Sequence, residues 1–313
     1  MNIQQGFLND EGRTTLHHSK ILVRYSLFFF IAALLGCEKD IIIEPAQTES
    51  TLVIEAQIEN GQGPVVILSK SLNYFSTIDV AALNESYVRG AKVTITTGNR
   101  TYTLTEFKVP LVGGYFFYYY GQFAGTATPL YGDFGKKYDL RIETDGKVYT
   151  ASTTIPMLTK RIDSLWWKKA PNNPDTTKAV LMARVTDPAG YGNYIRYFTK
   201  VNQDDFYPGR NSVYDDQIID GKTYDVQIDQ GITRNVKPAG EDYGYFKRGD
   251  TVTVKHCNID KATYDFWRTW EFSYQSIGNP FSSPGKVISN ISNGGLGSFC
   301  GYAVQYKTLI IPK

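Results

Sequence analysis

Alternation of apolar and polar residues, broken by short turns, is the feature that most constrains the fold of this chain. Between Thr51 and Ile58 every second side chain is apolar, which is the period of a half-buried β-strand. Residues 91–106 and 136–156 show similar alternation on both sides of a turn that contains glycine, so each predicts a β-hairpin. Closely spaced hairpins indicate a mainly β fold, with an antiparallel immunoglobulin-like or transthyretin-like sandwich over residues 51–156.

The remainder of the chain predicts a second β-rich domain over residues 157–313. Strand-like segments recur between Lys178 and Asn202 and again at the C-terminus. One helix is expected near residues 260–277, because Asp260 is a suitable N-cap and large apolar residues follow at helical spacing. We interpret its aromatic face as the side that docks on a sheet; this face consists of Phe266, Trp267, Trp270, Tyr274 and Ile277.

Six consecutive aromatic residues, Tyr115 to Tyr120, fall between the two hairpins. In a strand they would place rings on both faces, either as a stacking surface for a glycan or peptide or as part of a core. The sequence favours burial, because aromatic side chains dominate cores as well as interfaces.

Residues 1–36 contain, in the expected order, the segments of a lipoprotein signal peptide. Lys20 and Arg24 precede an uncharged run that is too short for a transmembrane helix. The run ends in Leu-Leu-Gly followed by Cys37, which resembles the lipobox of bacterial lipoproteins. We therefore expect cleavage before Cys37, attachment of acyl chains such as palmitate to this residue, and a tether over residues 37–50.

The chain offers few groups for catalysis, and we expect no catalytic site, no cofactor and no metal. Beyond the signal peptide His256 is the only histidine, and its place in an alternating strand indicates a structural role. The sequence contains no Gly-x-Ser-x-Gly elbow, no phosphate-binding loop and too few zinc ligands. The aspartates between Asp215 and Asp229 lack the spacing of an EF-hand, so we interpret them as a solvated acidic loop.

Two cysteines remain when Cys37 is acylated, and they bracket the expected helix. We favour a disulfide between Cys257 and Cys300, because a compartment outside the inner membrane permits it. The alternative is a pair of buried free thiols.

A long polar and aromatic loop is expected at residues 204–221, and loops of this length are often functional. We expect it to contact a partner or its cargo, since it offers aromatic rings and the planar donor group of an arginine. The alternative is an elaborate turn that packs on the helix. The candidate partner-binding residues are Phe206, Tyr207, Arg210 and Tyr214.

The segments YFKRGDTVTVKHCNIDKATYDFWRTWEF, NPFSSP, ISNGGLGSFCGYA and the terminal IIPK resemble the Bacteroidota lipoprotein family called domain of unknown function 4249. The segments YFTKVN and FYPGRNSVYDDQIIDG are also similar to it, so the resemblance covers almost the whole mature chain. It implies an envelope lipoprotein, often encoded near TonB-dependent outer-membrane receptors, and it implies no activity. Glu38-Lys39-Asp40 resembles the signal that directs such lipoproteins to the outer face of the outer membrane.

We therefore expect a lipid-anchored outer-membrane protein on the cell surface that binds a ligand as accessory to a TonB-dependent receptor in nutrient uptake. Its partners would be the membrane, through the N-terminal lipid, and an outer-membrane β-barrel receptor. Nucleic acid is not expected, because the net charge is only +2 and Lys and Arg form no cluster. The alternatives are a structural or adhesive envelope lipoprotein and a glycan-active hydrolase built from scattered carboxylates.

Overall fold

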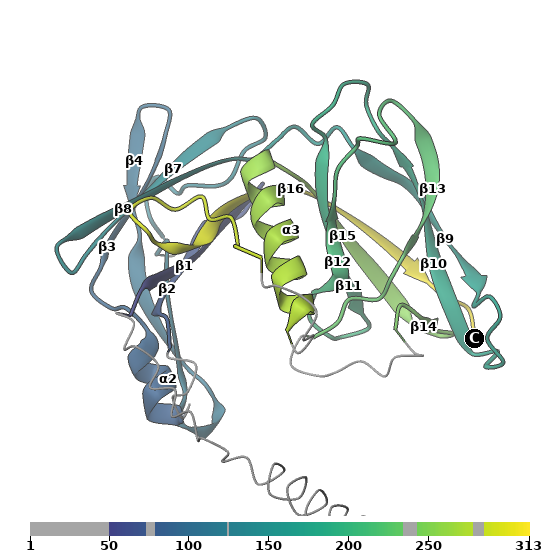
Figure 1. Ribbon diagram of the computed structural model, residues 1–313, viewed down its shortest axis with the longest axis horizontal. Helices are drawn as coiled ribbons and strands as arrows, with labels where there is room; N and C mark the ends of the chain where they lie inside the picture. Colours follow the sequence, from purple (N-terminus) through teal and green to yellow (C-terminus); the bar gives the residue numbers. More distant parts are fainter. Residues whose placement is uncertain (1–49, 73–78, 124, 234–242, 278–284) are drawn as a thin grey trace, which may run out of the picture. The chain divides into compact units, whose positions relative to one another are not determined.

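The part of the chain that the structure describes is mainly β. The computed structural model (Figure 1) describes residues 50–72, 79–123, 125–233, 243–277 and 285–313. These ranges hold three sheets, the helices α2 (Val80–Ser86) and α3 (Lys261–Ser276), and the short 3₁₀-helix η1 (Val112–Gly114). The expected signal peptide and Cys37 lie outside them. No helix within them is long and apolar enough to cross a membrane.

The strands form one large sheet and two smaller ones. The large sheet has eight strands in the order β12 (Tyr207–Tyr214), β11 (Tyr194–Val201), β15 (Thr251–Ile259), β16 (Leu296–Ile310), β1 (Leu52–Glu59), β2 (Val65–Lys70), β6 (Phe116–Gly121) and β5 (Thr105–Pro110). The second sheet has the order β4 (Arg100–Thr103), β3 (Lys92–Thr97), β7 (Lys137–Thr144) and β8 (Lys147–Thr154). In the third sheet β10 (Lys178–Thr186) pairs with β9 (Arg161–Lys169), β13 (Thr223–Ile228) and β14 (Phe246–Lys247).

Strand β16 joins the first and last parts of the described chain in one sheet. It runs parallel to β1 in its first half and antiparallel to β15 in its second, so that Glu59 and Ile259 both lie opposite Tyr302. Gly297 permits the close approach to β1, since its φ is 91° and an added Cβ would lie 2.0 Å from the carbonyl oxygen of Ile54.

Three apolar cores follow from the alternation of side chains along the large sheet. The first lies between β1, β2, β16 and the sheet of β3, β7 and β8, and it contains Ile54 and Phe299, both fully buried. The second lies between β15 and the sheet of β9 and β10, and it contains Val254. The third lies under α3 on the opposite face of β15 and β16, and it contains Cys257 and Tyr302.

The expected division into residues 51–156 and 157–313 stays a prediction. The first core belongs mainly to the earlier half of the chain and the second to the later half. However, β16 pairs with strands of both halves, and Glu49–Lys313 forms one compact unit.

Both expected hairpins and the expected helix are confirmed. Strands β7 and β8 meet at Asp145 and Gly146, whose positive φ values of 49° and 71° turn the chain within two residues. Asp260 caps α3 by accepting a hydrogen bond from the backbone N–H of Thr263 at 2.8 Å. The second oxygen of its carboxylate accepts a hydrogen bond from the N–H of Thr154, which ties the end of β8 to the start of the helix.

The prediction of a loop over residues 204–221 is wrong for Tyr207–Tyr214, which form the edge strand β12. Pro208 and Gly209 obscured this strand, because both residues are unfavourable inside sheets. An edge position tolerates proline, and a register shift opposite Arg196 and Phe198 interrupts the ladder next to it.

The predicted disulfide is also wrong. Cys257 and Cys300 are both free thiols and both buried. Cys257 lies opposite Val304, which is four residues beyond Cys300 on β16. This offset separates the two Cα atoms by roughly 13 Å along the strands at about 3.3 Å per residue, whereas a disulfide requires less than about 7 Å.

We therefore predict two thiols that react only when the protein unfolds. In a chain that begins after Cys37, thiol-specific reagents should react slowly with the folded protein, because burial raises the pKa of the Cys257 thiol to about 12 and keeps it protonated. When the protein is unfolded without reductant, two thiols per chain should react with the reagent. A titration that finds no free thiol after unfolding would contradict the described geometry.

Candidate functional site

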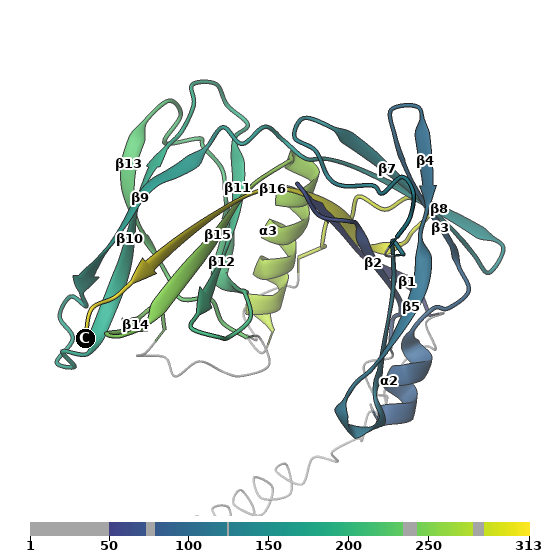
Figure 2. The same cartoon turned by 180° about the vertical axis from the view of Figure 1, so that it is seen from behind.

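A groove of about 650 Å³ lies between the large sheet and α3, and we call it the sheet–helix groove. Figure 2 shows α3 beside β16, with which it is in contact. This volume falls within the range of small-molecule sites, about 300–1,000 Å³. Alternate residues of three strands form its floor and α3 forms one wall; the floor comprises Val53, Glu55, Gln57, Val65, Ile67, Leu296, Ser298, Cys300 and Tyr302, and the wall Phe266, Trp267 and Trp270.

Arg196 of β11 brings a buried positive charge to the groove. Its side chain lines the groove, although only 3% of the residue is exposed. The guanidinium lies over the indole of Trp267, with Cζ 3.4 Å from the ring centroid. It donates hydrogen bonds to Ser212 Oγ at 3.1 Å and to Tyr302 Oη at 3.0 Å.

The charge of Arg196 has no direct counterion among the residues that the structure describes. Arg196 is connected to one carboxylate through Ser212. This carboxylate belongs to Glu271 of α3, and it accepts a hydrogen bond from Ser212 Oγ. Ser212 thus stands between the guanidinium and that carboxylate. A buried charge without a direct partner is costly, so this end of the groove is suited to an anionic group.

Glu55 of β1 introduces a carboxylate elsewhere on the groove floor. The residue is exposed, and its side chain lies on the groove side of the sheet. Neighbouring protein atoms remove part of the hydration of the carboxyl, which raises its pKa above the ordinary value. Glu55 lies opposite Ser298 and Arg196 contacts Tyr302, so about 13 Å of β16 separates the two polar positions at about 3.3 Å per residue.

The face of α3 that meets the sheet differs from the predicted one. Tyr264 and Trp267 pack in the third core, Glu271 binds Ser212, and Gln275 binds the backbone carbonyl of Arg210. The docking face is therefore turned relative to the expected aromatic face. Of the residues expected on it, Phe266 and Trp270 line the groove and Ile277 is 77% exposed.

The four candidate partner-binding residues do not share one surface. The ring of Phe206 lies 5.7 Å from that of Tyr306, whereas the ring of Tyr214 stacks on Tyr197 at 6.2 Å. Tyr306 and Tyr197 lie opposite consecutive residues of β15, so they belong to opposite faces of the sheet. Tyr207 and the exposed Arg210 lie on the strand between them. A partner contact at these residues stays a prediction.

His256 is buried on the face of β15 opposite the groove. His256 is 4% exposed, and among the described residues its Nδ1 atom has no hydrogen-bond partner. Burial, together with the nearby charge of Lys160, lowers the pKa of the imidazole to about 4. His256 is therefore neutral near pH 7 and is not placed to act as a base in the groove.

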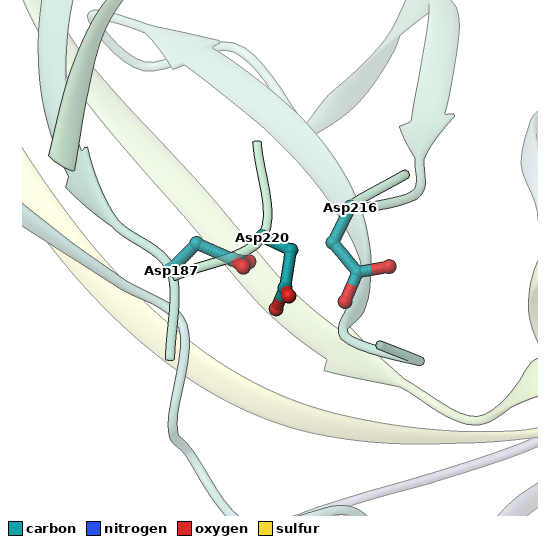
Figure 3. Close-up of side chains that lie close together, drawn as sticks. All are labelled: Asp187, Asp216 and Asp220. Atoms are coloured by element: carbon teal, nitrogen blue, oxygen red, sulfur yellow. The ribbon is translucent and has the colours of Figure 1, made fainter. Parts of the chain in front are cut away.

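Three aspartates converge at the loops that follow β10 and β12 (Figure 3). Asp187, Asp216 and Asp220 each offer a carboxylate oxygen, and these oxygens lie within 4.8 Å of one another. Such oxygens are ligands that Ca²⁺ accepts. The interpretation of a solvated loop is wrong for Asp216, which is 2% exposed.

Protein groups already bind these carboxylates. Lys160 Nζ lies 2.8 Å from Asp187 Oδ1, and both side chains are fully buried. Burial alone would raise the pKa of the Asp216 carboxyl. Hydrogen bonds donated by the backbone N–H groups of Asn193 and Gly192 outweigh this effect and lower the pKa. Because these donors come from the opposing loop and from Lys160, the cluster acts as a clamp between the loops.

Sequence reasoning missed Arg196, Glu55 and the pair of Lys160 and Asp187. Arg196 could have been noticed, because in an alternating strand it shares a face with the aromatic residues Tyr194 and Phe198. Glu55 occupies a polar position of β1 that resembles an ordinary solvated face. Lys160 precedes β9 in an irregular segment that carries no pattern.

We predict that replacing Asp187 by Asn strongly destabilises the fold. The change leaves Lys160 buried without a countercharge, which should reduce the free energy of unfolding by about 3–5 kcal/mol. Asp225→Asn, which breaks the exposed pair with Arg184, is the matched control and should leave the free energy of unfolding nearly unchanged. The double variant with Lys160→Met and Asp187→Leu should regain most of the free energy of unfolding that Asp187→Asn loses. Urea denaturation measures all three, and equal effects of the two single changes would contradict the account.

One protein family matches most of the chain. The family described as "Domain of unknown function (DUF4249)" matches residues 38–308. The comparisons with curated proteins and with solved structures found no similar protein. The match extends from the residue after Cys37 to near the end of β16 and includes every strand that lines the groove. The chain therefore belongs to the DUF4249 family.

Proposed function

We propose that this protein is a lipid-anchored binding protein of the outer membrane that holds a largely apolar ligand in the sheet–helix groove. The observation that carries this proposal is the groove itself. Apolar strand residues and the indole rings of Trp267 and Trp270 line it. Its lining also contains a few polar side chains, among them Arg196 and Glu55. Pockets with this composition are typical of small-molecule sites.

The groove is built on regular elements, and this supports a role in binding. Its floor residues lie on paired strands, whose backbone hydrogen bonds hold the side chains at fixed spacing. Arg196 and Trp267 are each held by a hydrogen bond to Tyr302 Oη. A preformed site of this kind loses little conformational entropy when a ligand enters.

The proposal includes attachment through Cys37 and a place on the cell surface beside a TonB-dependent receptor. The lipobox-like segment, the charged residues after Cys37 and the Bacteroidota resemblance support these points. Phe206 and Arg210, at the start of the edge strand β12, are candidate contacts with the receptor barrel. We also retain an immunoglobulin-like or transthyretin-like sandwich for residues 51–156; the core shared by β1, β2, β3 and β7 supports it.

The first test concerns the anchor. Cys37→Ser removes the thiol that would carry the acyl chain, so we expect an unprocessed precursor or loss of the protein from the membrane. Cys300→Ser keeps Cys37 and is the matched control for the change in chemistry. Detergent-phase partitioning and the mass of the N-terminus measure the outcome. Normal processing and partitioning of the Cys37→Ser variant would exclude lipidation at this residue.

The second test concerns the groove. Val65→Trp places an indole into the groove floor, whereas Val226→Trp makes the same change at a valine of β13 that is 38% exposed and does not line the groove. We expect protein purified from host membranes to carry a small molecule in the wild type and in Val226→Trp, and to lack it in Val65→Trp. Mass spectrometry of solvent extracts measures this, with circular dichroism to check folding. A folded Val65→Trp protein that retains the same molecule would show that the ligand binds elsewhere.

A further inference from the structure

The ligand class follows from the charge at one end of the groove, and it rests on the groove function proposed above. Arg196 is almost fully buried and lines the groove, yet its only described hydrogen-bond acceptors are two neutral hydroxyls, those of Ser212 and Tyr302. Its stacking on Trp267 holds the guanidinium plane but supplies no negative charge. A carboxylate that entered the groove would provide the missing countercharge and accept charge-assisted hydrogen bonds.

The remainder of the groove is suited to a hydrocarbon chain. From the Arg196 end, the floor continues along β16, β1 and β2, and its apolar side chains include Val65, Ile67 and Leu296. Polar side chains of β1 and β16 stand between them, namely Gln57, Glu55 and Ser298. The indoles of Trp267 and Trp270 cover one side of this path. Because burial of apolar surface is favourable in proportion to area, an elongated chain gains contact along the whole floor.

We propose that the sheet–helix groove binds a long-chain carboxylate, with its head group at Arg196 and its hydrocarbon chain directed toward Glu55. The head group compensates the buried guanidinium, and the chain displaces water from the apolar floor. Glu55 makes the groove at the level of Ser298 unfavourable for a second anionic group. The site therefore selects molecules with one acidic end and one apolar end.

Head-group comparison in the unaltered protein is the primary test. Decanoate and 1-decanol are titrated below their aggregation limits into the chain that begins at Glu38, which keeps the whole compact unit Glu49–Lys313. We expect one site per chain by calorimetry, and decanoate should bind at least about tenfold more tightly than decanol, as expected for a charge-assisted hydrogen bond. Equal affinities, or no decanoate binding, would overturn the proposal.

Two arginine variants assign the preference to the groove. Arg196→Gln should bind decanoate and decanol equally well, whereas Arg184→Gln, at an exposed arginine paired with Asp225, should keep the preference. If Arg196→Gln fails to fold, the head-group comparison still decides the question. Tighter binding of a short apolar peptide with an amidated C-terminus than of decanoate would also overturn the proposal.

The outcome separates the ligand class from the groove function. If decanoate does not bind but Val65→Trp still loses the small molecule that the wild type carries, the ligand class is wrong and the groove function stands. If decanoate binds Val65→Trp as tightly as the wild type, the binding site lies elsewhere and both proposals fail.

Discussion

The parallel pairing of β1 with β16 is the contact on which the rest of the structure depends. It brings the first described strand beside the last one, and it places β2, β6 and β5 in the same sheet as β15, β11 and β12. Without it, the floor residues of β1 and the arginine of β11 would not border one cavity. The close approach requires Gly297, because any side chain there would meet the backbone of Ile54. A single strand pair thus determines both the large sheet and the sheet–helix groove.

Buried charges at this sheet are compensated in two ways. On the face opposite α3, Lys160 and Asp187 form a direct, fully buried ion pair beside a neutral His256. On the face that carries α3, Lys255 and Glu59 also pair directly. Arg196, by contrast, contacts two hydroxyls and an indole, and none of the described residues gives it a direct carboxylate partner. A buried pair is complete within the protein and serves structure, whereas an incomplete one can be completed by a ligand. This contrast is the physical basis for assigning binding to the groove rather than to the aspartate clamp.

Local patterns in the sequence predicted the local structure well. The hairpin of β7 and β8 depends on Asp145 and Gly146, and the start of α3 depends on the Asp260 cap; both signals act within a few residues. The pairing of β1 with β16 links residues far apart in sequence and has no local signal, so it could not be predicted. The same limit explains the groove. Glu55 and Gln57 resemble the solvated face of a half-buried strand, and only the distant α3 and β16 make that face the floor of a cavity.

The central claim is that a carboxylate completes the charge of Arg196. The most direct measurement is a crystal structure of the chain from Glu38 grown with decanoate. We expect electron density for the carboxylate within hydrogen-bond distance of the Arg196 guanidinium, with the hydrocarbon chain along β16 toward Glu55. An empty groove at saturating decanoate, or a chain bound with its carboxylate away from Arg196, would contradict it.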